Sequence, residues 1–236
     1  MNNIYEPEFV KKLFNQMSNS YERMNYITSF GFSIRWRKQF LNKLGKSKEK
    51  LFVIDLLSGL GENWSFLKQN FPNSNFYALD FSENMINQSK DKSNKIFKGD
   101  LNLICDNILE NSLKSNHFDI VSCAYGLKTF NDEQLNIIAK EVSRILKPNG
   151  KFSFVEVSKP THKTLFYLYS FYLGKVIPIL GKLFLGNPED YKMLWIYTTQ
   201  FGNAEKVKEI FQNHNLEVHL DEYFGGCASG INGIKL

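Results

Sequence analysis

The chain has few of the residues that build metal sites and disulfide frameworks. Its three cysteines and four histidines are scattered, and none stand in a C-x-x-C or H-x-E spacing. Such spacings bring ligands onto one metal ion, and a disulfide framework needs cysteines at paired positions. We therefore expect no metal site and no disulfide.

The sequence also lacks a long apolar run and a leader. No charge-free apolar stretch reaches the about 20 residues of a membrane-spanning helix, and no signal peptide precedes the first expected helix. These two absences predict a cytoplasmic protein without a membrane span.

Positive charge is present but is not concentrated. The net charge is +5 and the pI is about 8.9, yet the lysines and arginines form no long basic run. The chain has neither an N-P-P-Y tetrad for a flipped base nor an added RNA-binding module. We expect no nucleic-acid partner. The 43% of hydrophobic residues in 236 suffice for one large core.

The most informative stretch runs from residue 51 to 80. An apolar run, Leu51–Ile54, ends on Asp55 and passes into the turn Ser58–Gly61; a helical apolar pattern and a second apolar strand, Phe76–Leu79, follow. Apolar runs bounded by glycine predict buried parallel strands. The stretch therefore predicts a strand-turn-helix-strand unit.

The turn and the acid at the second strand end predict a nucleoside site. Gly59 and Gly61 let a ligand lie against the backbone, and the helix that follows presents free N–H groups. Asp80, which directly precedes Phe81, comes 25 residues after Asp55, where an acid can accept both hydroxyls of a ribose.

Two ligands that contain a nucleoside are possible interpretations of this site: a dinucleotide such as NAD, and S-adenosylmethionine (SAM). The G-x-G-x-x-G fingerprint of dinucleotide sites is absent, because Trp64 stands where its third glycine would fall. Asp55 and Glu62 would repel a pyrophosphate, but they attract the ammonium and sulfonium groups of SAM. We favour SAM, with S-adenosylhomocysteine (SAH) as product; a glycine turn without any ligand is the remaining alternative.

An adenine site is expected at the next strand. Ser82 predicts a helix N-cap, Met85 begins the apolar face of a helix that ends near Lys92, and a short strand is expected at residues 95–100. This strand would end on Asp100, whose carboxylate could accept from the adenine amino group while Met85 and Leu101 enclose the ring.

The remaining pattern completes the sheet. Strands alternate with helices and then give way to a terminal β pair, which predicts an α/β fold with a doubly wound, mostly parallel, seven-stranded sheet and an antiparallel C-terminal edge. The expected elements are strands at 118–124 and 151–157, helices at 133–146 and 205–213, a turn at 147–150, and a hairpin of 217–224 with 231–236.

Two segments are expected to cover the site. Helices are predicted in residues 7–44, separated by a segment rich in Tyr, Asn and Ser that suits a lid; its alternative is a set of buried anchors. Residues 159–188 contain four lysines, no acid and many aromatic residues, among them Tyr169, and are broken by glycine and proline. Such a cover suits a greasy substrate and peripheral contact with an anionic membrane, but packing on its own domain alone is an equal alternative. We divide the chain into a helical lid, 1–45, and a main domain, 46–236, with the cover inserted at about 159–200.

The motifs together resemble class I SAM-dependent methyltransferases, and more narrowly the ubiquinone/menaquinone biosynthesis C-methyltransferase family, over nearly the whole chain. Four segments are similar to family signatures: residues 14–36 (FNQMSNSYERMNYITSFGFSIRW), 119–130 (DIVSCAYGLKTF), 155–160 (VEVSKP) and the tail GGCASGINGIK. The resemblance implies C-methylation of a hydrophobic, polyprenylated quinol, with Lys128 and Tyr125 as catalytic residues. It implies a cofactor set of Asp55, Gly59, Leu60, Gly61, Asp80, Phe81, Met85, Asp100, Leu101 and Ala124, and a substrate set of Tyr21, Asn25, Tyr125, Lys128 and Tyr169.

The sequence departs from the family pattern at several positions. The glycine turn holds Leu57 followed by Ser58, so that only Gly59 and Gly61 remain, and Lys128 replaces the family's arginine. Three alternatives therefore stay open: another hydrophobic or phenolic acceptor, transfer of a group of SAM other than methyl, and a non-catalytic SAM-binding assembly protein. The oligomeric state, a homodimer included, is open as well.

Overall fold

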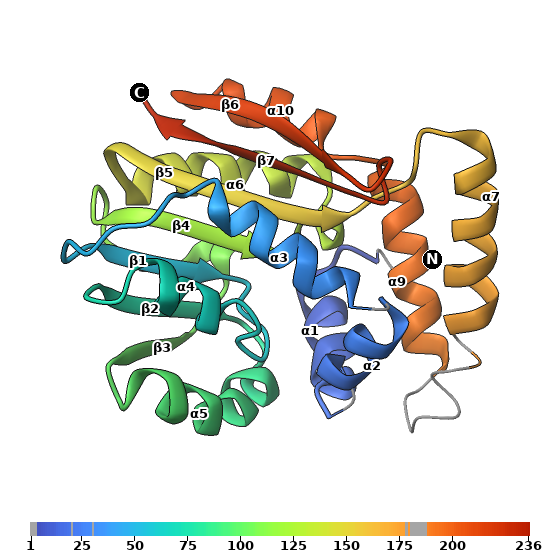
Figure 1. Cartoon of the computed structure of the whole chain (residues 1–236), viewed down its shortest axis with the longest axis horizontal. Helices are drawn as coiled ribbons and strands as arrows, with labels where there is room; N and C mark the ends of the chain where they lie inside the picture. Colours follow the sequence, from blue (N-terminus) through green and yellow to red (C-terminus); the bar gives the residue numbers. More distant parts are fainter. Residues whose placement is uncertain (1–3, 20, 30, 178, 180–187) are drawn as a thin grey trace.

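The protein is built around a single seven-stranded sheet. The computed structural model describes residues 4–19, 21–29, 31–177, 179 and 188–236. The strand order is β3-β2-β1-β4-β5-β7-β6, with β7 and β6 antiparallel to their neighbours and all other pairs parallel (Figure 1). The predicted fold is confirmed. The strands are β1 (Phe52–Leu56), β2 (Asn75–Asp80), β3 (Leu101–Cys105), β4 (Phe118–Ala124), β5 (Leu146–Val157), β6 (Leu216–Tyr223) and β7 (Ala228–Lys235).

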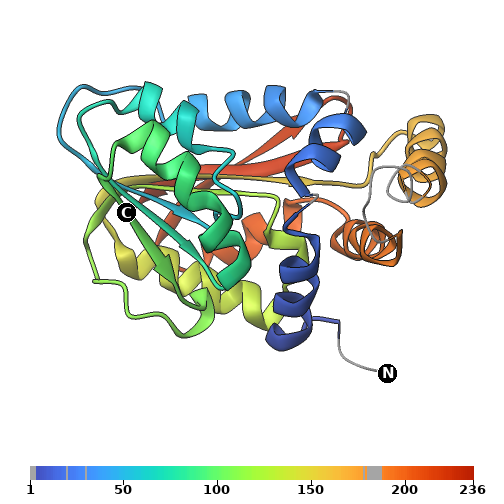
Figure 2. The same cartoon turned by 90° about the horizontal axis from the view of Figure 1, so that it is seen from below.

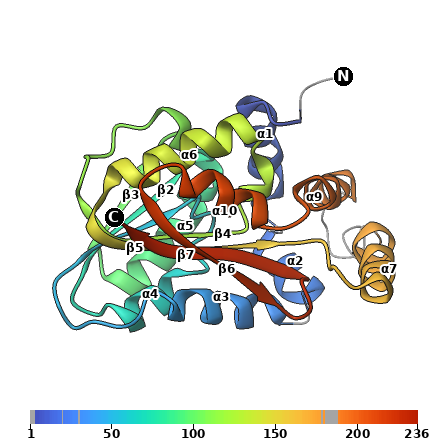
Figure 3. The same cartoon turned by 90° about the horizontal axis from the view of Figure 1, so that it is seen from above.

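Helices cover both faces of the sheet because each face is apolar. On one face lie α3 (Phe32–Asn42), α4 (Trp64–Asn70) and α5 (Glu83–Phe97), and on the other α6 (Asp132–Ile145) and α10 (Glu205–Gln212) (Figures 2 and 3). Each set packs on its own cluster of buried residues, the first around Phe40, Trp64 and Phe76, the second around Val142, Phe154 and Phe211. The sequence patterns predicted α4, α6 and α10 correctly.

A third group of helices lies beyond the carboxyl ends of the parallel strands (Figure 1). It consists of α1 (Pro7–Met17), α2 (Tyr21–Thr28), α7 (Lys163–Phe171), the π-turn η3 (Tyr172–Val176) and α9 (Pro188–Phe201). Short 3-10 turns, η1 (Ile108–Glu110) and η2 (Leu127–Thr129), follow β3 and β4. Among the described residues, no helix is both long and apolar enough to cross a bilayer.

The segment that we expected to separate two helices itself contains a helix. Residues 21–28 form α2 despite their Tyr, Asn and Thr content. Packing outweighs propensity here, because the ring of Tyr21, 7% exposed, meets that of Phe14 edge-on at 5.9 Å. The lid function of this segment stays a prediction.

The predicted strand at residues 95–100 is wrong. Helix α5 continues to Phe97, since Ile86, Ser89, Ser93 and Phe97 lie on one buried face at helical spacing. Lys98, with φ of 56°, ends the helix, and β3 begins only at Leu101. The turn expected at residues 147–150 is likewise part of β5, where the pairing with β4 shifts register.

Candidate functional site

The glycine turn after β1 is held by contacts that only small residues allow. Gly61 has φ of 75°, and a Cβ atom there would lie 2.3 Å from the ring of Trp64. Trp64 itself is 1% exposed and packs against Phe97 in the core. The ring therefore supports the turn from behind and leaves the cleft in front of Gly59 unobstructed by Trp64.

Asp80 lies at the carboxyl end of β2 and faces this cleft. Its carboxylate accepts hydrogen bonds from the backbone N–H groups of Gly59, 2.8 Å away, and Ser82, 2.9 Å away. Burial raises the pKa of Asp80 to about 6, although these hydrogen bonds oppose the shift. Five of the predicted cofactor residues line the cleft together: Gly59, Asp80, Phe81, Met85 and Ala124.

Asp55 lies behind the turn rather than in the cleft wall. It is 1% exposed, and its Oδ1 accepts from Ser122 Oγ at 2.7 Å and Asn63 Nδ2 at 2.9 Å. Burial raises its pKa to about 7. Within the described residues, its Oδ2 and the nearby Ser58 Oγ are buried without a hydrogen-bond partner. Unsatisfied acceptors beside a glycine turn fit the cationic amino group of SAM.

An arginine that the sequence patterns did not single out joins the turn to β4. Arg37 of α3, 5% exposed, donates to Asn63 Oδ1 at 2.8 Å, pairs with Glu62 at 3.2 Å and stacks 4.6 Å from the ring centroid of Tyr125. A signal existed, because Arg37 lies next to Trp36 in a helix whose other buried positions are apolar. Glu62 is thus neutralised by a protein cation.

The prediction of Asp100 and Leu101 as adenine ligands is wrong. Leu101 pairs with Phe76 at the start of β2, so that both predicted residues lie at the amino edge of the sheet, opposite the cleft. Asp100 lines a polar groove there with Lys50, Lys68 and Asn75. The error follows from the misplaced strand. The residues at the carboxyl end of β3 are Asp106, whose N–H donates to the carbonyl of Asp80, and Asn107, which lines a small cavity beside the cleft.

The other predicted cofactor residues have packing roles in this structure. Leu60 is 7% exposed and packs with Val10, Leu13 and Met17 of α1. Gly61 contacts Trp64 as described above. Ligand contacts of Leu60 and Gly61 stay predictions.

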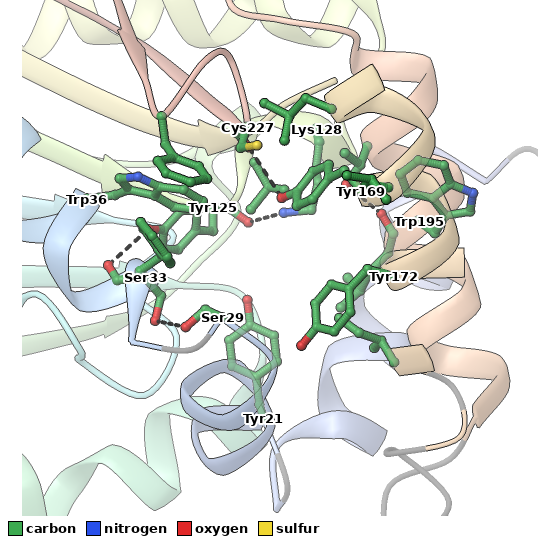
Figure 4. Close-up of a pocket in the computed structure, with 18 residues that line it drawn as sticks. Tyr21, Ser29, Ser33, Trp36, Tyr125, Lys128, Tyr169, Tyr172, Trp195 and Cys227 are labelled. Atoms are coloured by element: carbon green, nitrogen blue, oxygen red, sulfur yellow. Dashed lines mark hydrogen bonds between the residues drawn. The ribbon is translucent and has the colours of Figure 1, made fainter. Parts of the chain in front are cut away.

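A second, larger cavity adjoins the cleft and is mostly apolar. It has a volume of about 320 Å³ and lies between α2 and α3 on one side and α7, η3 and α9 on the other (Figure 4). Its wall contains the predicted substrate residues Tyr21, Tyr125, Lys128 and Tyr169. The side chain of Asn25 lies outside the described part of the structure. Residues of the wall that sequence reasoning did not propose for the substrate include Phe32, Trp36, Leu165, Trp195, Phe224 and Cys227.

Lys128 brings a cation into this apolar wall. Its Nζ lies 2.7 Å from Glu156 Oε1 and 2.9 Å from the carbonyl of Tyr125, and both charged side chains are nearly inaccessible, at 5% and 0% exposure. Glu156 also accepts from the backbone N–H groups of Lys128 and Val157. Buried ion pairs persist only where such hydrogen bonds satisfy them. The pair fixes Lys128 at the junction of β4 and β5.

Tyr125 is held as a neutral hydrogen-bond donor. Its hydroxyl donates to the carbonyl of Ser33 at 3.1 Å, and burial raises the pKa of Tyr125 well above its usual range, although Arg37 opposes the shift. Tyr21 and Tyr125 line both the cleft and the large cavity. The two spaces therefore meet at these two rings, where a group bound in one can reach a molecule bound in the other.

Comparisons with known proteins find methyltransferases that match nearly the whole chain. A model of the ubiE/COQ5 methyltransferase family matches residues 1–235. A demethylmenaquinone methyltransferase of Listeria welshimeri is 30% identical, covering 97% of this chain and 96% of that protein. One of Staphylococcus aureus is 31% identical, covering 97% and 93%.

Solved structures with low sequence identity share the fold. A SAM-dependent methyltransferase of Thermotoga maritima, described as a possible histamine N-methyltransferase, superposes with a TM-score of 0.67 at 16% identity, covering 95% of this chain and 99% of that one. Geranyl diphosphate C-methyltransferase of Streptomyces coelicolor, solved with SAH, gives 0.60 at 10% identity, covering 86% and 80%.

Proposed function

Because the chain belongs to the ubiE/COQ5 methyltransferase family and is a SAM-dependent C-methyltransferase of quinone biosynthesis, we propose that it methylates a ring carbon of a hydroxynaphthoquinol that carries an apolar tail. The names of its relatives point to demethylmenaquinone, and methyl transfer to carbon requires the electron-rich reduced form of this ring. One observation of the structure carries the proposal: an apolar cavity of about 320 Å³ shares Tyr21 and Tyr125 with the cleft that holds Gly59 and Asp80.

The cleft residues are proposed to hold SAM, which supplies an electrophilic methyl group. Asp80 would accept the ribose hydroxyls, as its place at the strand end allows. The unsatisfied Ser58 Oγ, in the cleft wall, would accept from the amino group of the cofactor, and Asp55 Oδ2, buried behind the turn, would attract the same cationic group by its charge. Asn107 and Asp106 replace Asp100 as the polar residues nearest the adenine, since they follow β3 at the correct edge.

Lys128 is proposed to hold the quinol as a phenolate. Lysine has three N–H donors, and two of them are taken by Glu156 and the carbonyl of Tyr125. The third can donate to a ring oxygen in the cavity, which stabilises the electron-rich anion whose carbon accepts the methyl group. Methyl transfer would leave a neutral ketone and SAH. The proton on the methylated carbon would then pass to water, and the electron pair of that C–H bond would restore the aromatic ring, with the negative charge again on the oxygen held by Lys128.

The test combines the purified protein, SAM and chemically reduced demethylmenaquinone. We expect mass spectrometry to show the methylated naphthoquinone together with SAH in equal amounts. Release of methylthioadenosine instead would favour transfer of another group. The absence of any quinone product, with SAM binding intact, would contradict the proposed substrate.

Peripheral contact with an anionic membrane is proposed for the face formed by α7. None of the nine residues of this helix is buried, and Tyr167, Leu168 and Phe171 are 72%, 66% and 65% exposed. Residues 159–188 contain lysines but no acid. Leu168 also lines the large cavity, so that the exposed apolar face continues into the proposed quinol site. Such a face suits a lipid surface from which a greasy substrate enters.

Vesicle sedimentation tests this contact. We expect the protein to bind phosphatidylglycerol vesicles more strongly than phosphatidylcholine vesicles, and Tyr167→Ser with Phe171→Ser to lose most of this binding. Ile137→Ser on α6, an exposed apolar residue on another face, is the control. Self-association through α7 in the absence of lipid, with no vesicle binding, would make a second copy the occupant and overturn the proposal.

A further inference from the structure

Leu57 occupies an unusual position in the cofactor cleft. It follows β1 directly and has φ of 51°, a left-handed backbone conformation that is uncommon for a non-glycine residue and unfavourable for a bulky one. Its side chain lines both the cleft beside Gly59 and the small cavity beside Asn107. Leu57 therefore stands between the two spaces that a single nucleoside ligand would have to span.

The Leu57 side chain packs directly against the backbone of Gly126. A Cβ atom on Gly126 would lie 2.5 Å from Leu57 Cδ1 and 3.0 Å from Leu57 Cβ. Both residues follow central, neighbouring strands, β1 and β4. The leucine thus fits only because position 126 has no side chain, and it has little room to move towards β4.

The free space on either side of Leu57 is small. The cleft holds about 40 Å³ and the cavity beside Asn107 about 10 Å³, whereas pockets for ligands of this class measure roughly 300–1,000 Å³. We propose that Leu57 sets the affinity for SAM, because its side chain lies between the cleft, which would hold the ribose and the methionine part, and the cavity beside Asn107, which would hold the adenine, and must be displaced when the cofactor enters. This inference rests on the cofactor site proposed at this cleft.

If the Leu57 side chain must be displaced before SAM binds, the observed affinity for SAM is lower than the intrinsic affinity. If only a fraction of molecules has this side chain displaced and the site open, the observed dissociation constant is the intrinsic one divided by that fraction. Removing the side chain at residue 57 abolishes this factor. Leu57→Ala removes the side chain beyond Cβ, whereas Leu57→Gly also relieves the cost of the left-handed backbone conformation, so the pair of variants separates bulk from backbone effects.

Calorimetry of SAH binding tests the inference without any turnover. We expect Leu57→Ala and Leu57→Gly to bind SAH about tenfold or more tightly than the original chain, in the range expected when the open fraction is about a tenth. Leu220→Ala, the same exchange at a partly buried position of β6 away from the cleft, is the control and should leave the affinity unchanged. Unchanged or weaker SAH binding in both Leu57 variants would overturn the inference, and movement of α1 and α2 would then be the step that opens the cleft.

Gly126→Ala supplies a second, independent measurement. Residue 126 has φ of −109°, which alanine adopts without strain, so the methyl group acts through its contact with Leu57. We expect Gly126→Ala to weaken SAH binding severalfold in the original chain and to have no effect in the Leu57→Gly background, which lacks the Leu57 side-chain atoms that the new methyl group would meet. Equal effects in both backgrounds would contradict the role of Leu57. Failure of the proposed substrate is distinguishable, since it leaves SAH binding intact and removes only the quinone product.

Discussion

At the residue scale, the two acids Asp80 and Asp100 show what sequence spacing can and cannot establish. Both follow an apolar stretch, and both were expected at the carboxyl edge of the sheet. Asp80 is there, in contact with the N–H of Gly59, whereas Asp100 precedes β3 and lies at the opposite edge. The same chemical group therefore faces the proposed cofactor cleft at one position and the opposite edge of the sheet at the other.

This contrast gives a matched mutational test. Asp80→Ala removes the charge-assisted hydrogen bonds that we propose between Asp80 and the ribose, which we expect to weaken SAM binding by about 1.5–3 kcal/mol. Asp100→Ala, the same exchange at the far edge, should not change the affinity. Isothermal titration calorimetry of both variants checks the prediction, and equal affinities would contradict the ribose role of Asp80.

The Lys128–Glu156 pair makes a prediction about stability and turnover together. Lys128→Met leaves the carboxylate of Glu156 buried without its cation, at a cost of about 3–5 kcal/mol in the free energy of unfolding. The double variant Lys128→Met/Glu156→Gln should regain most of that stability in urea unfolding, yet it should not regain turnover. SAM binding should persist in the double variant. Turnover at the original rate would show that Lys128 serves structure alone.

Asp55 predicts a pH dependence of stability. In the unfolded chain its carboxyl loses the proton near pH 4, whereas burial in the folded chain raises the pKa to about 7. Between these values the folded chain binds more protons than the unfolded chain, so that stability falls as pH rises and levels off above about pH 7. Asp55→Asn cannot ionise and lacks this decline.

Urea unfolding of the cofactor-free protein at pH 5 to 8 measures the effect. We expect the free energy of unfolding of the original chain, relative to Asp55→Asn, to fall with rising pH by on the order of 2–4 kcal/mol. Asp91→Asn, at an exposed position of α5, is the control. A difference that stays constant over this range would show that the folded-state pKa of Asp55 is not raised.

At the scale of elements, the bounds of a helix or strand were predictable where the residues of that segment alone specify it. β1, β2 and β4 are apolar runs that end beside glycine or an acid, and their bounds followed closely from the sequence. α5 and β3 did not, because Lys95-Ile96-Phe97 is compatible with a strand as well as with the last turn of a helix. Only the burial of Phe97 between Trp64 and Phe76 decides for the helix.

The start of α5 was predictable, and it has a second role that was not. Ser82 Oγ accepts from the N–H of Met85 and also lies 2.6 Å from Asn15 Oδ1 of α1. The cap therefore anchors α1 beside the cofactor cleft. We expect Ser82→Ala to lower the free energy of unfolding by about 1–2 kcal/mol.

Hydrogen exchange can separate the two roles of Ser82. In Ser82→Ala we expect faster amide exchange in the first turn of α5 and in α1, while α6 on the other face keeps its protection. Ser112→Ala, at an exposed loop position, is the matched control. Unchanged exchange in α1 would contradict the anchoring role.

At the scale of the whole molecule, the order of strands was predictable but the large cavity was not. Alternation of strands and helices requires a layered sheet, and the turn at Gly59 identifies its ligand edge. The cavity wall combines residues from Tyr21 to Cys227, drawn from the helices α2, α3, α7 and α9, the short turns η2 and η3, strand β5, and the loops after β4 and β6. No local spacing relates these residues, so that only the packing of the complete chain brings them together.

The position of β7 between β5 and β6 has a consequence for biosynthesis. Because β6 pairs with β7 and with no other strand of the sheet, a nascent chain translated only as far as Tyr223 has nowhere to dock its latest strand. Until residues 228–235 leave the ribosome, β5 presents a bare edge that could capture another polypeptide. The growing chain thus passes through an aggregation-prone stage, and a chaperone that covers the edge of β5 would act at this stage.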